Sequence, residues 1–168
     1  PITKKAYFRT PYINPGIKML YNFAMTHYPH QHYWNVDNMW THANINELMP
    51  YIKEISRTLP PSPAHMLWLN WYPPKERQQM AFSMEDNIYI ALYGSWKNKS
   101  DSDKYQNWAT SHMLTMQHLS TGIQLADEGL HKRAAKFIAD EHLKKLDEIR
   151  AQRDAKNIFN AWHSRPEI

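Results

Sequence analysis

The sequence predicts an α+β fold in which an antiparallel sheet has helices packed on one face, followed by a C-terminal helical segment. Residues 65–72 and 87–93 are two apolar runs of strand length separated by a short polar stretch, which favours an antiparallel hairpin. The segments with helical spacing are long and lie between antiparallel strands. Because few units have the pattern of a parallel crossover, a layer of helices on one face of the sheet is the expected closure.

The first strand is predicted at residues 32–40, after an irregular stretch in which only residues 17–25 suit a short helix or strand. Side chains of a strand point alternately to the two faces of its sheet. The two sets are Tyr33, Asn35, Asp37 and Met39 on one side, and Trp34, Val36, Asn38 and Trp40 on the other. One face of this strand is therefore expected to be polar.

A helix is predicted between the first strand and the hairpin. Apolar residues recur at helical spacing over residues 45–59, and Asn44 or Asn46 is available as the N-terminal cap. Pro50 is tolerable only near the first turn of such a helix. A cluster of prolines follows at positions 60, 61 and 63, so the helix is expected to end there.

The chain after the hairpin is predicted to be mainly helical. The stretch 100–103 supplies capping side chains for one long amphipathic helix, which Gly122 ends. Residues 123–125 could add a short edge strand. Asp140 is the expected cap of a last helix, which carries apolar residues at helical spacing.

The composition predicts one domain, or one large part of a domain. Of 168 residues, 42% are hydrophobic and 21% are charged, which suffices for a core and is too apolar for a disordered chain. No apolar stretch approaches the roughly 20 residues that span a bilayer. We therefore expect a soluble protein without a membrane partner, and a cytoplasmic location is slightly favoured. Because the sequence begins at Pro1 rather than at Met, we expect a piece of a longer protein.

Charge and cysteine content argue against several kinds of site. The net charge is +4, but the basic residues are spread along the chain and form no dense stripe, so no nucleic-acid partner is expected. The absence of Cys excludes disulfides and thiolate metal sites. His27, His30 and His32 have the look of metal ligands, but Pro29 disrupts a helical presentation and no fourth ligand follows. No metal is predicted.

A series of landmarks in the second half of the chain points to a protein class. They are Ala81-Phe82, Tyr89, Trp96, Trp108 and Gly122, then Leu143, Leu146, Asp154 and Asn157-Ile158-Phe159. In order and spacing they resemble the C-terminal portion of FAD-linked oxidoreductases of the berberine-bridge-like, vanillyl-alcohol-oxidase (PCMH-type FAD) class. The resemblance covers residues 36–162 and is strongest from Met80 onward. It implies a substrate-binding (cap) portion at residues 1–130 and a C-terminal helical segment at 131–168, which would pack on an FAD-binding domain missing from this chain.

The sequence departs from the pattern of the class in several places. Met84-Glu85-Asp86 stand where the class has an arginine, Ala155 replaces a proline, and residues 122–128 lack the tyrosines of a Tyr-x-Asn-Tyr segment. The tyrosine base of the sugar oxidases therefore has no counterpart here. The four glycines, at positions 16, 94, 122 and 129, form no phosphate-binding loop, so FAD is expected in the full-length enzyme and not on this chain alone.

The resemblance also indicates where substrate would bind. In this class the substrate domain lays a sheet over the reacting face of the flavin, so polar or aromatic side chains on the strands contact substrate. The candidate substrate-binding residues are Tyr33, Asn35, Trp68, Asn70 and Tyr72. Trp68 and Tyr72 are explained at least as well as core or interface residues, whereas Asn70 is harder to bury without a partner.

Two further residues are candidates for roles in the chemistry. Asp37 is the candidate catalytic base, because oxidation of an alcohol or amine needs a group that takes a proton as hydride leaves to the flavin. Gln124 lies where the flavin-facing segment of the class passes, and its amide could bind the flavin edge or the substrate. A solvated loop glutamine is the alternative for Gln124.

The resemblance implies the C-terminal substrate-binding part of an enzyme that oxidises a small alcohol, amine or sugar-like substrate by hydride transfer to FAD. The isolated chain is then expected to be inactive. The alternative is a stand-alone binding module without chemistry, whose exposed aromatic residues stack on carbohydrate or on a protein partner. A third interpretation is a homodimer, in which the apolar side meant for the flavin domain pairs with itself.

Overall fold

The computed structural model describes residues 16–73, 84–127, 129–156 and 158–159. Contacts divide the chain into two units, Pro1–Gln31 and His32–Ile168. In the first unit, α1 (Ile17–His27) is a helix, which decides between the two predicted alternatives for residues 17–25. The second unit contains the strands and the remaining helices.

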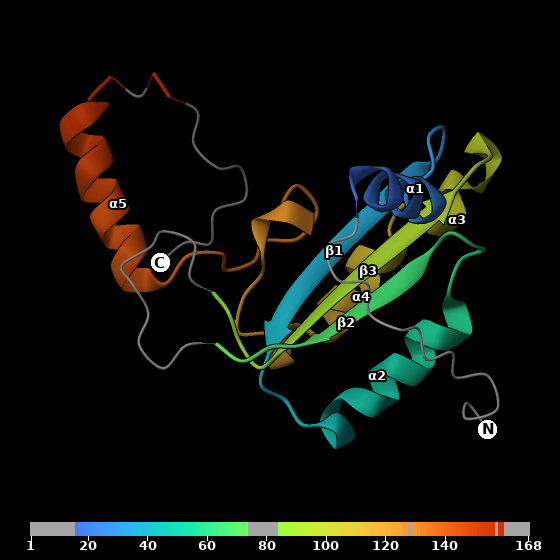
Figure 1. The fold of residues 1–168 in the computed structure, drawn as a ribbon. Helices are drawn as coiled ribbons and strands as arrows, with labels where there is room; N and C mark the ends of the chain where they lie inside the picture. The colour runs from blue at the N-terminus through green and yellow to red at the C-terminus, as the bar shows by residue number, and fades with distance from the viewer. Residues whose placement is uncertain (1–15, 74–83, 128, 157, 160–168) are drawn as a thin grey trace. The chain divides into compact units, whose positions relative to one another are not determined.

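The sheet of the second unit consists of three antiparallel strands, β1 (Tyr33–Thr41), β2 (His65–Asn70) and β3 (Ile88–Trp96). Their spatial order is β1-β3-β2, so β3 is central (Figure 1). The three predicted strands and the antiparallel pairing of β2 with β3 are confirmed, with small shifts in the bounds. The predicted polar turn between β2 and β3 lies outside the described residues.

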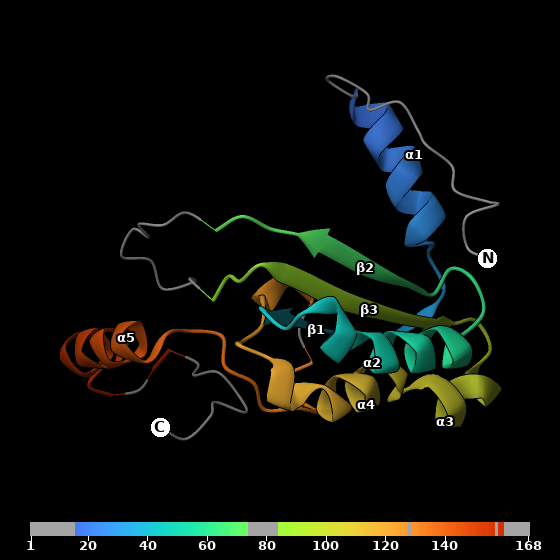
Figure 2. The same cartoon turned by 90° about the horizontal axis from the view of Figure 1, so that it is seen from below.

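One face of the sheet is covered by α2 (Ile45–Thr58), α3 (Ser102–Tyr105) and α4 (Trp108–Thr115) (Figure 2). This arrangement confirms the predicted α+β fold. We call this side of the sheet the helix face. The buried residues of its core are Met39, Ala43, Leu48, Ile55, Ile90, Leu92, Trp108, Ala109, Met113 and Met116. Their spacing follows from the period of two along the strands and the helical period of α2 and α4.

Helix α2 begins with a capping box. The side-chain oxygen of Asn44 accepts hydrogen bonds from the backbone N–H of Asn46 at 2.9 Å and of Glu47 at 3.2 Å. The Glu47 carboxylate in turn accepts from the backbone N–H of Asn44 at 2.8 Å. Asn44 is therefore the cap, and Asn46 lies inside the first turn.

The prediction of one long helix after residues 100–103 is wrong. The segment forms α3 and α4 with a break at Gln106 and Asn107, and short 3₁₀ turns lie before and after them. The break has a tertiary cause: Asn35 of β1 caps the N-terminus of α4, accepting from the backbone N–H of Ala109 at 2.8 Å and of Thr110 at 3.3 Å. A continuous helix would occupy these N–H groups with its own carbonyls.

The predicted edge strand at residues 123–125 is also absent. Only Gly122 forms an isolated bridge with Trp40 of β1, and the chain then makes the 3₁₀ turn η4 (Leu125–Asp127). The bridge consists of the Trp40 N–H donating to Gly122 O at 2.7 Å and the Thr121 N–H donating to Trp40 O at 2.9 Å. The rest of this segment is held by contacts with the Asn38 side chain of β1 and by a backbone hydrogen bond from the Ile123 N–H to Lys136 O at 2.8 Å, rather than by a ladder.

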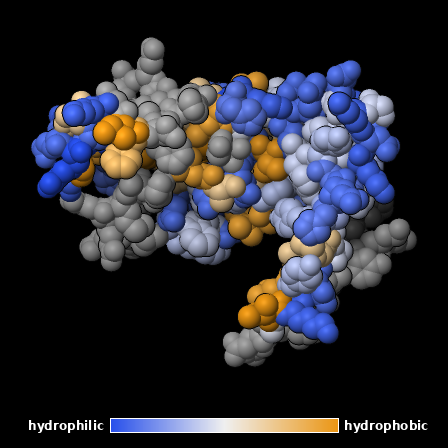
Figure 3. Space-filling model, turned by 90° about the horizontal axis from the view of Figure 1, so that it is seen from above, coloured by the Kyte–Doolittle hydropathy of each residue, from blue (hydrophilic) through white to orange (hydrophobic). Residues whose placement is uncertain are grey.

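The last helix, α5 (Asp140–Arg153), is confirmed, although Asp140 is its first residue and Ala139 occupies the cap position. Leu143 packs into a second, smaller core formed by Ile123, Leu130, Ala135, Phe137 and Ile138. The other sides of α5 are mostly hydrophilic, as the left part of Figure 3 shows. The predicted division at residue 130 concerns packing on an absent domain and stays a prediction.

Candidate functional site

A pocket of about 600 Å³ opens on the face of the sheet opposite to the helices, which we call the pocket face. All its lining residues belong to the second unit, His32–Ile168. They are Trp40, Leu69, Trp71, Met84, Glu85, Tyr89, Ile123, Gln124, Leu125, Ala126, Asp127 and Phe137. A volume of this size and an apolar lining with a few polar groups are typical of sites for small molecules.

The floor of the pocket is aromatic. Trp40 of β1 and Tyr89 of β3 are cross-strand partners on the pocket face, and their ring centroids are 4.8 Å apart. The Trp71 ring lies 6.2 Å from that of Trp40. Trp71 follows β2 and remains attached to the sheet, because its backbone N–H donates to Asn87 O at 2.7 Å. Three aromatic rings from three parts of the sheet therefore line one cavity.

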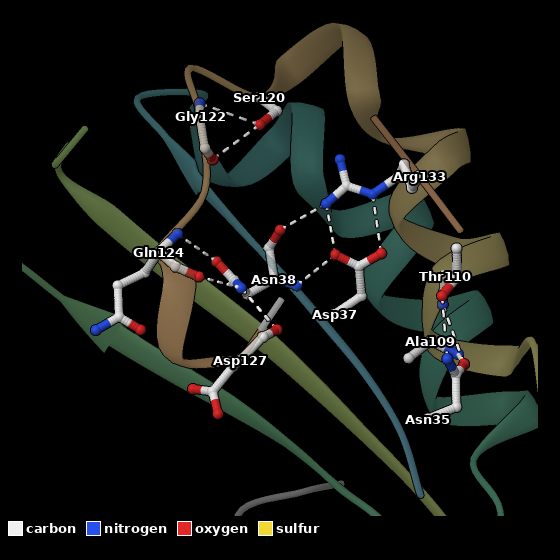
Figure 4. A network of polar contacts seen from close by, with 10 residues as sticks. All are labelled: Asn35, Asp37, Asn38, Ala109, Thr110, Ser120, Gly122, Gln124, Asp127 and Arg133. Atoms are coloured by element: carbon white, nitrogen blue, oxygen red, sulfur yellow. Dashed lines mark hydrogen bonds and ion pairs between the residues drawn. The ribbon is translucent and has the colours of Figure 1, made fainter. Parts of the chain in front are cut away.

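One wall of the pocket is the segment from Gly122 to Asp127, and Asn38 fixes its position (Figure 4). The Nδ2 of Asn38 donates to Gln124 O at 2.8 Å and to Asp127 O at 2.7 Å. The Oδ1 of Asn38 accepts from the Gln124 N–H at 2.8 Å. Since Asn38 is fully buried, each of these bonds replaces one that water would otherwise make, and the wall is held at a defined distance from β1.

The polar groups of the pocket are mainly acidic. Oδ2 of Asp127 accepts hydrogen bonds from the Tyr89 hydroxyl at 3.0 Å and the Tyr93 hydroxyl at 2.8 Å. Glu85 accepts a long hydrogen bond from Trp71 Nε1 at 3.4 Å. Among the described residues, those that line the pocket include no Lys, Arg or His. The pocket therefore presents two carboxylates in a protein whose net charge is +4.

Asp37, the predicted base, forms a buried ion pair with Arg133 beside the pocket wall (Figure 4). The Arg133 guanidinium donates through Nε to Oδ2 at 2.9 Å and through Nη2 to Oδ1 at 2.5 Å, and it also donates to Asn38 O at 2.8 Å. Oδ1 of Asp37 accepts a further bond from the Asn38 N–H. Asp37 is 0% exposed, so in this conformation its carboxylate makes internal contacts and is not accessible from solvent.

Gly129 is part of the same buried arrangement. A Cβ at this position would lie 2.9 Å from Oδ2 of Asp37, which is closer than real Cβ contacts allow. At Gly94, a Cβ would lie 3.0 Å from Cε3 of Trp108. Both glycines therefore allow close packing, and neither belongs to a loop that could hold the phosphates of a dinucleotide. Gln124 lines the pocket and is exposed, so its amide is available to a ligand.

The other predicted substrate-binding residues lie away from the pocket. Asn35 and Trp68 are on the helix face, where Asn35 caps α4 and Trp68 packs against the core. Asn70 accepts a hydrogen bond from Trp68 Nε1 at 2.9 Å. Tyr33 stacks on Trp96, with centroids 5.7 Å apart. Tyr72 follows β2 and is 89% exposed.

Of the predicted site residues, Gln124 alone is among those lining the pocket. The strand period of two grouped Tyr33, Asn35 and Asp37 correctly on one face, but it does not tell which face the helices cover. The sequence reasoning missed Asp127 and the aromatic floor. A usable signal existed, because Trp40 and Trp34 lie on the other face of the same strand, and an aromatic set at this spacing suits a wall for ligands.

Among the described residues, no three His, Asp or Glu side chains come together in a group that could hold a metal ion. His27 belongs to α1, where its Nδ1 lies 2.9 Å from Phe23 O. Among the described helices, none is long and apolar enough to cross a membrane.

Comparison with known proteins gives no relative from which a role could be transferred. No protein-family model, curated protein or solved structure matches the chain.

Proposed function

We propose that this chain is the C-terminal substrate-binding part of an FAD-dependent oxidoreductase of the berberine-bridge-like class. One observation carries the proposal: the pocket opens on a face of the sheet, and one of its walls is the segment from Gly122 to Asp127. In the class that the sequence resembles, the corresponding segment passes the flavin. Gln124 of this segment lines the pocket, as expected for a residue that meets flavin or substrate. The missing partner is an FAD-binding domain, on which the C-terminal segment 131–168 would pack.

In this proposal the residues of the chain bind and orient a small alcohol, amine or sugar-like substrate. FAD, when bound, supplies the acceptor for the hydride. Trp40, Trp71 and Tyr89 offer ring faces for the apolar body of the substrate, and the apolar lining excludes water from the reacting carbon. Of the two lining carboxylates, Asp127 is held in place by two tyrosine hydroxyls, so it would orient the hydroxyl or amino group of the substrate.

The proposal is tested with the protein purified from its natural gene. We expect a visible absorption spectrum of bound flavin and its bleaching when substrates are added without oxygen. A panel of primary alcohols, amines and aldoses covers the expected classes. A colourless protein that releases no flavin on denaturation would contradict the proposal.

A second candidate, a stand-alone binding module, is favoured by a different observation. Tyr72 is 89% exposed, and Trp71, which lines the pocket, is 43% exposed, so aromatic surface is accessible after the end of β2. Such a module would bind carbohydrate or a protein partner without chemistry. The flavin measurement separates the two candidates, because only the oxidoreductase contains the cofactor.

A further inference from the structure

We infer that the pocket selects a protonated amine with a compact aromatic or apolar body, that is, an arylalkylammonium ion. The charged side chains of the pocket favour a cation. Among the described residues that line the cavity, Glu85 and Asp127 are the charged ones, and both are acidic. A ligand cation placed beside Asp127 would be attracted, whereas a carboxylate ligand there would be repelled.

The geometry of Asp127 also favours a cationic ligand. Its Oδ2 accepts from the hydroxyls of Tyr89 and Tyr93, and Oδ1 accepts no hydrogen bond from the described residues. The backbone of Asp127 is fixed by Asn38 at 2.7 Å, so the carboxylate is held in place before a ligand arrives. Figure 4 shows the side chains of Gln124 and Asp127 both pointing away from Asn38. Oδ1 is thus an acceptor that an ammonium group can use.

The aromatic floor favours a cation that carries a ring. Trp40, Tyr89 and Trp71 surround one side of the cavity, with centroid distances of 4.8 Å and 6.2 Å from Trp40. Ring faces attract a cation and also stack on the ring of an arylalkyl ligand. A neutral alcohol of the same shape would gain only the stacking. Charge and ring contacts together therefore favour the amine over the alcohol and the alcohol over the acid.

That such an amine is a substrate rests on the proposed function, but its binding does not require a flavin. The binding is therefore measured on the 168-residue chain itself by calorimetric titration. Benzylamine, benzyl alcohol and benzoate are three ligands of nearly equal size that differ in charge at neutral pH. We expect benzylamine to bind about tenfold more tightly than benzyl alcohol, and benzoate to bind more weakly than both.

Two variants locate the charge preference. Asp127→Asn keeps the size of the side chain, and we expect it to weaken benzylamine binding about tenfold while leaving benzyl alcohol binding unchanged. Asp103→Asn is the matched control. It removes the same charge, but Asp103 is exposed on α3 at the helix face. This control is expected to bind all three ligands as the unaltered chain does.

A third variant reports on the aromatic floor and guards against misfolding. Trp71→Leu changes a side chain that is 43% exposed, so the fold is expected to survive, and benzylamine binding should weaken several-fold. For Asp127→Asn, benzyl alcohol binding and a circular dichroism spectrum equal to those of the unaltered chain would show that the variant is folded.

Three results would overturn the inference: no benzylamine binding, equal affinity for amine and alcohol, or equal losses in Asp127→Asn and Asp103→Asn. Flavin in the natural protein combined with a preference for alcohol would overturn the inference and leave the proposed function standing. Amine binding by a protein without flavin would overturn the proposed function and leave the inference about amine binding standing.

Discussion

The two faces of the sheet are built from the same three strands, yet they differ in what their polar residues do. On the helix face, Asn35 and Asp37 are buried, and their polar atoms are occupied by the N-terminus of α4 and by Arg133. On the pocket face, Asn38 is equally buried, but it fixes a chain segment whose side chains remain open to a cavity. A polar residue on a strand can therefore position a site without contacting the ligand itself.

The largest expected effect concerns the ion pair that joins β1 to the chain behind the pocket wall. Arg133→Met leaves the fully buried Asp37 carboxylate without its guanidinium, so we expect the free energy of unfolding to fall by about 3–5 kcal/mol. Urea denaturation measures this loss of unfolding free energy. The double variant Asp37→Leu/Arg133→Met removes both charges and should recover most of the loss. A single variant that costs less than about 1 kcal/mol would contradict a structural role for this pair.

The next effect separates the core of the helix face from its surface. Leu48 is 0% exposed between α2 and the sheet, so Leu48→Ala should lower the free energy of unfolding by about 2–5 kcal/mol through lost burial and a cavity. Leu114→Ala in α4 is the control, because Leu114 is 50% exposed and its loss should change stability by less than about 0.5 kcal/mol. Similar losses in thermal or urea unfolding would show that α4 presents a different side to the sheet.

A pair of identical substitutions on β1 compares the two faces directly. Asn35→Ala and Asn38→Ala each leave buried backbone groups without a partner, and each should cost about 1–3 kcal/mol of stability. Asn38→Ala should also weaken benzylamine binding, because the segment that carries Asp127 loses its attachment. Asn35→Ala should leave binding unchanged. Equal binding by the two variants would show that Asn38 does not position the pocket wall.

The smallest expected effect is a dependence of stability on pH at the helix face. Burial lowers the pKa of His112 below its ordinary value of 6.5, and the charge of Glu54 opposes this only in part. Between the lowered and the ordinary pKa the unfolded chain binds more protons than the folded one. The contribution to stability is therefore complete above about pH 6.5 and is lost as the pH falls below it. His112→Gln should flatten this part of the urea-unfolding profile, whereas His131→Gln, at an exposed position, should leave it unchanged.

Local patterns were sufficient to predict most of the fold. The alternation in β1, the apolar spacing of α2 and its proline-rich end each depend on neighbouring residues, and the structure has these elements close to the expected bounds. The break between α3 and α4 could not be predicted in the same way. It depends on Asn35, a residue 74 positions away from Ala109 in the sequence.

The candidate site was predictable only in part for a similar reason. Gln124 was found through the resemblance, and it lines the pocket. Asp37 was predicted as the catalytic base because hydride transfer needs a proton acceptor, but its carboxylate is paired with Arg133, which lies 96 positions further along the chain and could not be inferred from local sequence. Asp127 was overlooked because it lies on an irregular turn, whose position is set by Asn38 rather than by any periodic pattern.

The central claim is that substrate reacts in the cavity of the pocket face. The most direct test is the rate of flavin reduction, without oxygen, in the protein from its natural gene, for two variants that add the same bulk on opposite sides of the sheet. Leu125→Trp fills the cavity, and Leu114→Trp places the same side chain on the exposed surface of α4. We predict equal flavin content in both, with reduction by substrate strongly slowed in Leu125→Trp alone. Unslowed reduction in Leu125→Trp, or equal slowing in both variants, would contradict the claim.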